Sequence, residues 1–485
     1  MNNLIQAAAV LVWCAARSQL LIIQRAHTQR AFPGQWAFPG GVLDPADRSA
    51  GDSRQESAAR QCVLRELFEE TGILPGYQGS DDLQTEQIAL LNQNISWPDL
   101  CQKLNYVPPV EQLQSLGMRV TPPIMPRTFE TYYFLLEVPD RIPVGQISSE
   151  LAQALWITPA DLMANWATGE ASIPPPVLEV VRVLANQGLN LPALWSQSHD
   201  AQTLPIPMEM FPGIEMLPLR TPTVPPATHT NGYFVGQERF VIIDPASPYP
   251  EEQAILRQAL QRRLDLGHEP LAVLLTHHHV DHVGGAEFVR DWLRIPIMAH
   301  ADAAEHLPFA ITEPIEDGQI WHLGQDPYSG QDWQLQAVLT PGHAPGHLCF
   351  VDLRHRVAMV GDMLAGLGTI LIKRPKGNMG QYLASLQRLI DLNLSKGFPA
   401  HGPQIPDLAK RCQEYIDHRL AREDQIIAKL GSGVMTIEQL LPLVYGDTPK
   451  ELWPLAKLSL EAHLHHMMEN EQAQNFGELW VIRSL

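Results

Sequence analysis

Thr276-His277-His278-His279-Val280-Asp281-His282-Val283-Gly284-Gly285 follows directly on the apolar run Leu271–Leu275. The apolar run predicts a buried strand, and packing gives no reason for a strand to end in so many ligand-type side chains. Imidazole nitrogens together with carboxylate oxygens suit Zn²⁺, Mn²⁺ or Fe, and the absence of thiolates argues against a purely structural zinc site. The stretch therefore predicts a metal centre at the end of a strand.

Three further ligand-type residues lie downstream of this stretch. They are His343 in Thr340–His347 (TPGHAPGH), Asp362 in Val360-Gly361-Asp362 and His401 in Pro399–Pro403 (PAHGP). Together with the first stretch they resemble the metallo-β-lactamase superfamily at all seven ligand positions and in the same order. The resemblance implies a metallo-β-lactamase αβ/βα sandwich with a dinuclear hydrolytic site.

The same resemblance implies two metal ions, expected to be Zn²⁺ with Mn²⁺ or Fe as alternatives. Two such ions lower the pKa of a bound water and stabilise a developing oxyanion. Asp281 would orient the attacking water and is the expected catalytic residue. The first ion would be bound by His277, His279 and His343, the second by Asp281, His282 and His401, and the bridging ligand would be Asp362.

Three polar residues near these motifs have other expected roles. His278 lies between two of the ligands and is expected to point away from the metal centre. Two interpretations stay open for His347 and for Asp244, which either orient ligands or serve only in turns.

The sequence beyond these motifs narrows the resemblance to one branch of the superfamily. Asn378–Leu386 and Tyr415–Glu423 are similar to the branch that includes the lactamase-B-like endoribonuclease and glyoxalase II-type thioesterases. The final helices, from Val434 to about Met468 with Glu478–Ile482 as the wing, resemble the winged-helix tail of that branch. Because this tail has few bases, we expect packing or dimerisation of it rather than nucleic-acid binding.

A second cluster of ligand-type residues lies near the N-terminus, in Arg65–Ile73 (RELFEETGI). Glu66, Glu69 and Glu70 are spaced i, i+3 and i+4, which places them on one face of a helix. Three crowded carboxylates repel one another, so the arrangement makes sense if Mg²⁺ or Mn²⁺ neutralises it. A solvated acidic helix face would be the alternative for the glutamates alone.

The sequence upstream favours the metal site. Trp36–Val42 (WAFPGGV), followed by the glutamate helix, resembles the Nudix box, in which a glycine-pair loop precedes a metal-binding helix. The resemblance implies an α/β/α sandwich that hydrolyses diphosphate bonds with Mg²⁺ or Mn²⁺. It implies metal-ligand roles for Glu66, Glu69 and Glu70, catalytic roles for Glu69 and Glu70, and substrate-binding roles for Gly40 and Gly41.

This box departs from the usual pattern in two ways. The chain from Gly41 to Arg65 is ten residues longer than usual, and Ser57 occupies the position of the expected upstream glutamate. An inserted loop would leave the helix in register, with Glu56 substituting for the missing acid. The insertion and the segment Met125–Phe134 are similar to the branch of the peroxisomal coenzyme A diphosphatase, in which Arg127 would bind a phosphate or pair with a core acid.

Composition limits the class of protein. The chain has 485 residues, 45% of them hydrophobic, and a formal net charge of −19, so the basic surplus of a non-specific nucleic-acid binder is absent. Five cysteines without a C-x-x-C pair make a disulfide framework improbable and fit a reducing cytoplasm. No stretch approaches the roughly 20 apolar residues that span a membrane. We therefore expect a cytoplasmic protein with no membrane partner.

The chain is predicted to be a multidomain α/β and α+β protein. We expect a Nudix domain over residues 1–195, a proline-rich linker over 196–207, a metallo-β-lactamase-fold domain over 208–405 and a helical tail over 406–485. Between Leu74 and about Pro126 the sequence is polar and irregular, apart from a helix near Gln84–Asn92. The tail is expected to be wholly helical from Pro406 to about Met468.

Both domains imply metal-assisted hydrolysis. The first hypothesis is a bifunctional hydrolase of small nucleotide or coenzyme A-type metabolites, whose Nudix site cuts a diphosphate bond and whose second site cuts an ester, thioester or phosphodiester. A nuclease for RNA or single-stranded DNA with an accessory Nudix domain is an alternative that the charge disfavours. A Nudix domain that only senses a nucleotide is the third reading. The sequence also leaves open whether the protein forms a homodimer.

Overall fold

The chain folds into two compact units, residues 1–204 with 209–212 and residues 205–208 with 213–485. The computed structural model describes residues 4–26, 28–29, 33–48, 55–79, 83–121, 128–190, 207–225, 227–431 and 433–483. Each unit has its own sheets and its own apolar cores. The expected multidomain α/β organisation is confirmed.

The first unit contains a mixed sheet of seven strands. Five of them have the order β3-β2-β1-β6-β5, while β4 pairs with β1 and β7 pairs with β2. Only the central pair β1 and β6 is parallel among the pairings within this sheet. The strands are β1 Ile5–Cys14, β2 Gln19–Arg25, β3 Trp36–Ala37, β4 Gly40–Val42, β5 Gln114–Val120, β6 Phe129–Val138 and β7 Leu151–Ile157.

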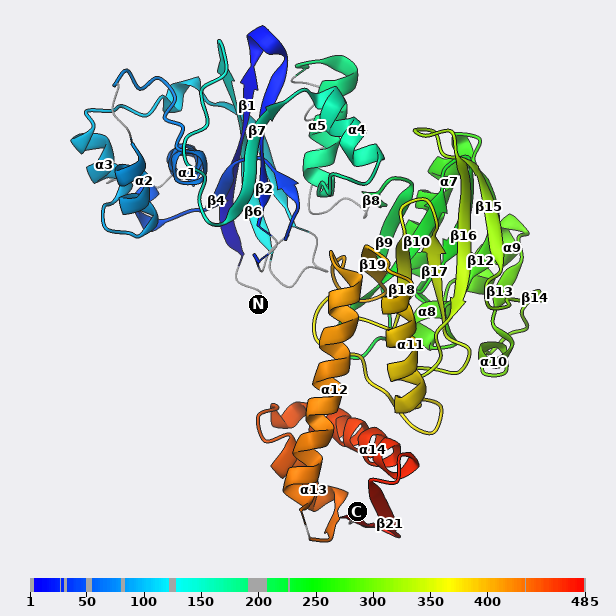
Figure 1. The fold of residues 1–485 in the computed structure, drawn as a ribbon. Helices are drawn as coiled ribbons and strands as arrows, with labels where there is room; N and C mark the ends of the chain where they lie inside the picture. The colour runs from blue at the N-terminus through cyan, green and yellow to red at the C-terminus, as the bar shows by residue number, and fades with distance from the viewer. Residues whose placement is uncertain are drawn as a thin grey trace. The chain divides into compact units, whose positions relative to one another are not determined.

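Helices cover both faces of this sheet, with α1 to α3 on one side and α4 and α5 on the other (Figure 1). Along β1, Val10 and Val12 join the core around α1, whereas Leu11 and Trp13 join the core beside α4 and α5. A strand covered on both faces is apolar at every position, which explains the unbroken apolar run in β1. The helices are α1 Gln55–Thr71, α2 Gln84–Leu91, α3 Trp97–Lys103, α4 Pro159–Ala167 and α5 Pro175–Gln187.

The second unit is built on two sheets. One has the order β14-β13-β12-β11-β10-β9-β8 and the other the order β15-β16-β17-β18-β19. The first comprises β8 Met208–Phe211, β9 Ile214–Arg220, β10 His229–Gly236, β11 Arg239–Ile243, β12 Glu269–Leu274, β13 Ile297–Ala299 and β14 Glu313–Pro314. The second comprises β15 Ile320–Gln325, β16 Asp332–Leu339, β17 Leu348–Asp352, β18 Val357–Gly361 and β19 Lys396–Pro399.

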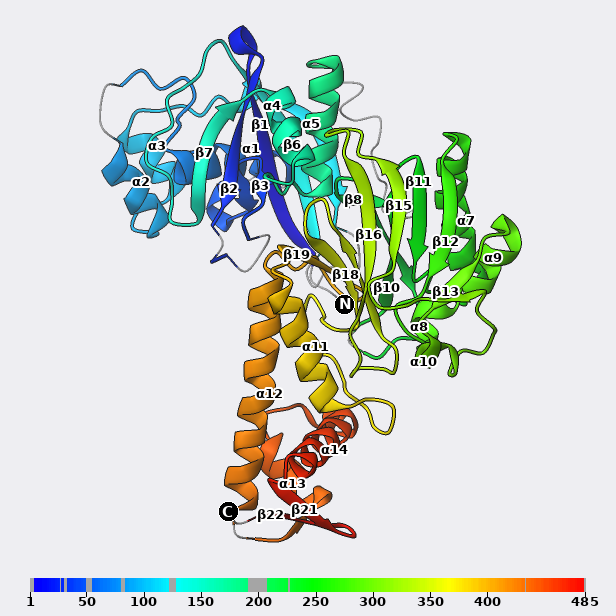
Figure 2. The ribbon, with the colours of Figure 1, turned by 45° about the vertical axis from the view of Figure 1, so that its right-hand side comes forward.

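Helices cover the outer faces of these two sheets, so the unit is an αβ/βα sandwich (Figure 2). α7 (Pro250–Asp265) and α9 (Ala286–Leu293) pack on the seven-stranded sheet, and α11 (Met379–Asp391) and α12 (Leu408–Leu430) pack on the five-stranded sheet. The short helices α8 (Val280–Val283) and α10 (Ala301–Ala304) lie in connections. Both sheets therefore direct connections toward a common end of the sandwich.

A small C-terminal module completes the second unit. α13 (Ile437–Val444) and α14 (Trp453–Glu469) pack with the end of α12 around a core of their own. The strands β20 (Met435–Thr436), β21 (Ala473–Phe476) and β22 (Leu479–Ile482) form a sheet of order β20-β22-β21. The expected winged-helix tail is confirmed, although β20 interrupts the helical stretch expected from Pro406 to Met468.

Candidate functional site

All seven predicted ligands of the second unit come from connections that follow strand ends. In sheets with parallel neighbours, binding sites form at the carboxyl ends of the strands, and β11, β12, β18 and β19 end there. The connection after β12, which includes α8, holds His277, His279, Asp281 and His282. The connections after β16, β18 and β19 supply His343, Asp362 and His401.

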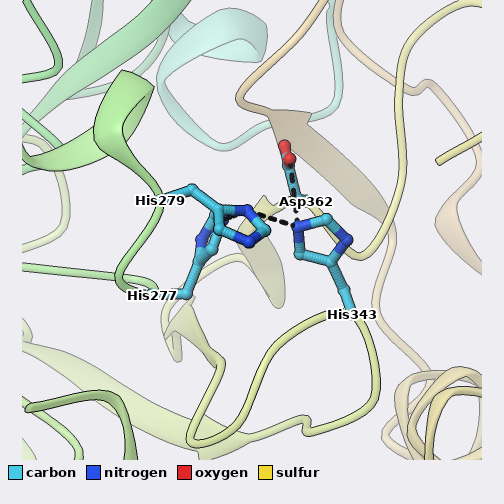
Figure 3. Close-up of side chains that lie close together, drawn as sticks. All are labelled: His277, His279, His343 and Asp362. Carbon is cyan, nitrogen blue, oxygen red and sulfur yellow. Dashed lines mark hydrogen bonds and ion pairs between the residues drawn. The ribbon is translucent and has the colours of Figure 1, made fainter. Parts of the chain in front are cut away.

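These side chains meet in two groups, the first of which is drawn in Figure 3. In the first group, Nε2 of His277 and Nε2 of His343 lie 2.8 and 3.0 Å from Nδ1 of His279. Within each group the candidate ligand atoms all lie within 4.8 Å of one another. The first group is His277, His279, His343 and Asp362, and the second is Asp281, His282 and His401.

The carboxylate of Asp362 lies between the two groups. Its Oδ2 is 3.4 Å from Nε2 of His343 in the first group. Its Oδ1 is 3.6 Å from Nε2 of His282 and 3.3 Å from Nε2 of His401 in the second group. One carboxylate thus faces both groups, which is the position predicted for a bridging ligand.

Backbone carbonyls orient two of the imidazoles. Nδ1 of His343 donates to the carbonyl oxygen of Leu371 at 3.0 Å, and Nδ1 of His401 donates to the carbonyl oxygen of His229 at 3.0 Å. Since a carbonyl oxygen only accepts, the proton of each ring is on Nδ1. In the neutral ring, each Nε2 therefore presents a lone pair to the centre of the site.

Asp244 orients a third imidazole, that of His282. The Asp244 carboxylate lies at the end of β11 and accepts hydrogen bonds from Nδ1 of His282 at 2.7 Å and from the backbone N of Thr276 at 2.8 Å. The Thr276 hydroxyl donates to the same carboxylate at 2.6 Å. Asp244 thus holds both the His282 ligand and the strand end that carries the motif. Of the two roles left open by the sequence, the structure shows the one in which Asp244 orients a ligand.

His347 supports the bridging carboxylate, whereas His278 belongs to neither group. The backbone N of Asp362 donates to Nε2 of His347 at 3.2 Å, and Nδ1 of His347 lies 3.0 Å from the Thr340 hydroxyl. His278 instead packs its ring 4.9 Å from that of His306. His278 therefore supplies no ligand atom to either group, although its ring also lies 4.9 Å from that of His279.

Of the predicted ligands, His279 and Asp281 already have the protonation state that binds metal ions. Burial, reinforced by the neighbouring His343, lowers the pKa of His279 to about 3, so the imidazole is neutral. Burial raises the pKa of Asp281, but His282 and His401 outweigh it and hold this pKa at about 2. Neutral imidazoles and ionised carboxylates are the forms that bind metal ions. Burial lowers the pKa of His282 and of His401, but the carboxylate of Asp362 outweighs it and raises both, so these two rings would release a proton when a metal ion binds.

Two buried atoms provide a direct test of the fit to cations. Within the described part of the chain, Nε2 of His282 and Oδ1 of Asp362 have no hydrogen-bond partner although both are buried. A buried polar atom without a partner is costly, and here a lone pair and a carboxylate oxygen both face the same centre. The donor set therefore fits a pair of divalent cations.

The glutamate cluster of the first unit lies on α1, beside the glycine pair. The backbone N of Gly40 donates to Glu70 at 3.0 Å. A Cβ added to Gly41 would lie 2.4 Å from the carboxylate carbon of Glu66, so a larger residue there would displace the end of the Glu66 side chain. Both glycines thus contact the helix carboxylates. Arg127 lies outside the described residues.

Arg65 holds the other carboxylates of this cluster. Its guanidinium donates to Glu66 at 2.9 Å and to Glu69 at 2.8 Å. Burial is the largest influence on Glu66 and, although Arg65 opposes it, raises the pKa of that carboxyl to about 7. Burial also raises the pKa of Glu70 well above its ordinary value, with repulsion from Glu66 adding to the effect. The guanidinium of Arg65 thus does not offset the effect of burial on these carboxyls, whose pKa values stay raised, and this suits a hard cation.

The acid that pairs with Arg65 is Asp47 rather than Glu56. The Asp47 side chain is fully buried and accepts from Arg65 at 2.8 and 3.0 Å, within the short helix Pro45–Asp47. Glu56 instead pairs with Arg60 at 3.0 Å, with 48% of its side chain exposed. The expectation for Glu56 is therefore not met. Asp47 lies within the stretch Leu43–Arg54 that the sequence predicts as an inserted loop, 18 positions before Arg65.

Comparisons with known proteins agree with both sites. Family models match residues 225–401 as the metallo-beta-lactamase superfamily, residues 4–177 as a NUDIX domain and residues 436–480 as a beta-lactamase associated winged helix domain. The lactamase-like protein adaB of Aspergillus niger is 32% identical over 265 residues, which are 51% of this chain and 78% of the relative. The chain belongs to the metallo-beta-lactamase superfamily.

Another superfamily relative has a name that states an activity. The atrochrysone carboxyl ACP thioesterase of Cryptosporiopsis sp. is 32% identical over 236 residues, 45% of this chain and 67% of the relative. Among solved structures, a beta-lactamase domain protein from Burkholderia ambifaria has a TM-score of 0.50 at 19% identity and covers 58% of this chain and 96% of its own. This structural likeness shows the fold.

This metallo-beta-lactamase superfamily chain, with its additional NUDIX domain, is a hydrolase. Both domains imply the use of divalent metal ions. Within the described residues, no helix is both long enough and apolar enough to cross a membrane.

Because Asp47 and not Glu56 is the partner of Arg65, substitution of Asp47 should destabilise the NUDIX domain more than substitution of Glu56. Asp47→Ala leaves a buried guanidinium without its main partner and should lower the free energy of unfolding by about 3–5 kcal/mol. Glu56→Ala removes an exposed pair and should lower it by about 0.5 kcal/mol or less. Urea denaturation of both variants measures the difference, and equal losses would contradict the assignment of Asp47.

Proposed function

We propose that the protein acts on acyl-coenzyme A-type metabolites, cutting the thioester at the metallo-beta-lactamase site and the diphosphate bond at the NUDIX site. The observation that carries this proposal is the presence in one chain of two separate donor sets, a histidine and aspartate cluster and a glutamate cluster. A coenzyme A thioester contains both bonds, whereas a carrier-protein thioester has a phosphodiester and no diphosphate. The thioesterase name of a relative supports the choice of the thioester.

At the metallo-beta-lactamase site, we propose that the two groups of side chains hold two Zn²⁺ ions, with Mn²⁺ or Fe as alternatives. When bound, such ions lower the pKa of water and stabilise the oxyanion of the attacked carbonyl. Asp281 supplies the catalytic carboxylate, since its Oδ2 lies 3.5 Å from Nε2 of His401 and it is ionised at neutral pH. It accepts a hydrogen bond from the attacking water and orients that water toward the thioester carbon.

At the NUDIX site, we propose that Glu66, Glu69 and Glu70 hold Mg²⁺ or Mn²⁺, which neutralises the phosphate charge of the substrate when bound. Arg65 fixes Glu69, and the backbone of Gly40 fixes Glu70, so both carboxylates are held in place for proton transfer from the attacking water. We also propose that Arg127 contacts a substrate phosphate.

The purified full-length protein with acyl-coenzyme A tests this proposal. Thioester hydrolysis releases the free acid and the coenzyme A thiol, and diphosphate hydrolysis releases adenosine 3′,5′-bisphosphate. We expect both products, because joining the two sites in one chain raises the effective concentration of the first product at the second site. The absence of both products at high enzyme concentration would contradict the proposal.

A nuclease is the second candidate, favoured by the winged-helix tail. The net charge of −19 weighs against it, because nucleic-acid binding depends on phosphate neutralisation by bases. Single-stranded RNA that stays intact with the wild-type protein, or that is cut equally by Asp281→Asn, excludes this candidate.

A further inference from the structure

The segment between β18 and α11 runs along the metallo-beta-lactamase site. The carbonyl oxygen of Leu371 accepts from Nδ1 of His343 at 3.0 Å, and the backbone N of Asn378 donates to the carbonyl oxygen of Gly342 at 2.8 Å. Residues 371–378 are thus tied at both ends to the connection that carries His343. We call residues 372–378 the basic loop.

The basic loop is positively charged within an acidic protein. The chain has no Asp or Glu between Asp362 and Asp391, while its net charge is −19. The loop itself carries Lys373, Arg374 and Lys376. A local basic surplus beside a metal site attracts anionic groups of a substrate.

The three cations of the loop differ in their surroundings. Arg374 pairs with Glu469 at the end of α14 at 3.4 Å, so the C-terminal tail already neutralises its charge. This end of α14 lies beside the segment that leads into α11 (Figure 2). Lys373 and Lys376 are exposed, and across the described ranges neither has a carboxylate partner. The ammonium of Lys376 donates to Nε2 of His278 at 3.4 Å, next to the ligand motif. The ammonium of Lys376 therefore lies at the edge of the site, and Lys373 lies three residues before it in the same loop.

We propose that Lys373 and Lys376 bind a phosphate group on the carrier part of the thioester substrate. This inference rests on the proposed function, in which one metabolite has a thioester for one site and a phosphate-containing carrier. The loop is held by Arg374 and Asn378, which both contact Glu469, so the two lysines are presented without further ordering of the backbone. Lysine ammonium groups bind phosphate as compact charges.

Three substrates with the same acyl group test the inference. Acyl-pantetheine has no phosphate and acyl-4′-phosphopantetheine has one. In acyl-coenzyme A the same phosphate is one half of the diphosphate, and the nucleotide also has a 3′-phosphate. The variant Lys373→Ala/Lys376→Ala should lower kcat/KM for the phosphorylated thioesters relative to acyl-pantetheine by about 10- to 100-fold, because two exposed ammonium groups no longer contact the phosphate. The matched control is Lys429→Ala, an exposed lysine in the last turn of α12.

The pattern across the three substrates identifies the phosphate. A loss with both phosphorylated thioesters supports the phosphate of the pantetheine arm, which coenzyme A and carrier proteins share. A loss with acyl-coenzyme A alone supports the phosphates on the nucleotide side. An equal loss with all three, or no change in the ratios, would overturn the inference.

A binding measurement separates this inference from the proposed function. If the wild-type protein hydrolyses none of the three thioesters, the proposed function fails. Calorimetric titration with 4′-phosphopantetheine, which has no diphosphate for the NUDIX site, then tests phosphate binding by the basic loop separately. A Kd about tenfold higher in the double lysine variant upholds the phosphate site, and an unchanged Kd overturns it.

Discussion

Asp281→Asn is expected to lower kcat for thioester hydrolysis by about 100- to 10,000-fold, the contribution of a positioned acid–base group. Asparagine has nearly the same shape as aspartate but no negative charge, so it cannot accept the proton of the attacking water. The Asp281 oxygen that lies 3.5 Å from Nε2 of His401 also loses its negative charge. Steady-state kinetics with acyl-coenzyme A, followed separately through the free acid and through adenosine 3′,5′-bisphosphate, measures the effect at each site.

The control for this variant is Asp265→Asn, an exposed aspartate at the end of α7. Metal content is measured on every preparation, because Asp281 belongs to the second group of candidate ligands. A variant that keeps its metal and loses its rate supports the orienting role, and one that loses both supports the ligand role. A wild-type thioesterase rate in Asp281→Asn would contradict both.

Sequence alone locates every side chain of the histidine and aspartate cluster, because each lies in a short motif next to the end of an apolar strand. It does not locate the acceptors that orient them. The carbonyl oxygens of Leu371 and His229 hold two imidazoles, yet every residue has such a carbonyl, and only the folded chain determines which one meets a ring.

Asp47 illustrates how an insertion conceals a contact. The residue lies 18 positions before Arg65 in the chain and contacts it directly in the structure. A local signal was present, since Asp44-Pro45-Ala46-Asp47 forms a capping box with proline at the first helical position. That signal marks a helical turn where the sequence was expected to form a loop, but it does not identify the partner of the acid.

The edge strand β5 of the first unit, which the sequence did not predict, lacks a periodic signal. β5 lies at the edge of the sheet and pairs only with β6, and of its side chains only Leu116 is buried. Alternation between core and solvent is the main sequence signal of a strand, and an edge strand with one buried residue does not show it. The segment from Leu74 to about Pro126 was therefore expected to be irregular, although it contains α3 and β5.

Glu69→Gln/Glu70→Gln is expected to lower the rate of diphosphate hydrolysis by about 100- to 10,000-fold, again the contribution of positioned acid–base groups. The amide oxygens can still accept the hydrogen bonds from Arg65 and from the backbone N of Gly40, but the variant has two fewer negative charges on this face of α1. Release of adenosine 3′,5′-bisphosphate measures the rate. Glu56→Gln, on the exposed face of the same helix, is the matched control.

Stability distinguishes this loss of function from simple misfolding, because the carboxylates oppose folding when no metal is bound. Burial is the largest cause that raises the pKa of Glu66, from 4.5 to about 7. A folded-state pKa above the unfolded one gives a contribution to stability that is present below about pH 4.5 and is lost as the pH rises through about 7. Burial also raises the pKa values of Glu69 and Glu70. The melting temperature of the metal-free NUDIX domain should therefore fall over this range, less steeply in the glutamine variant, which retains only Glu66 of the three. Mg²⁺ should raise it at higher pH in the wild type but not in the variant, and an equal response in both proteins would contradict the glutamate site.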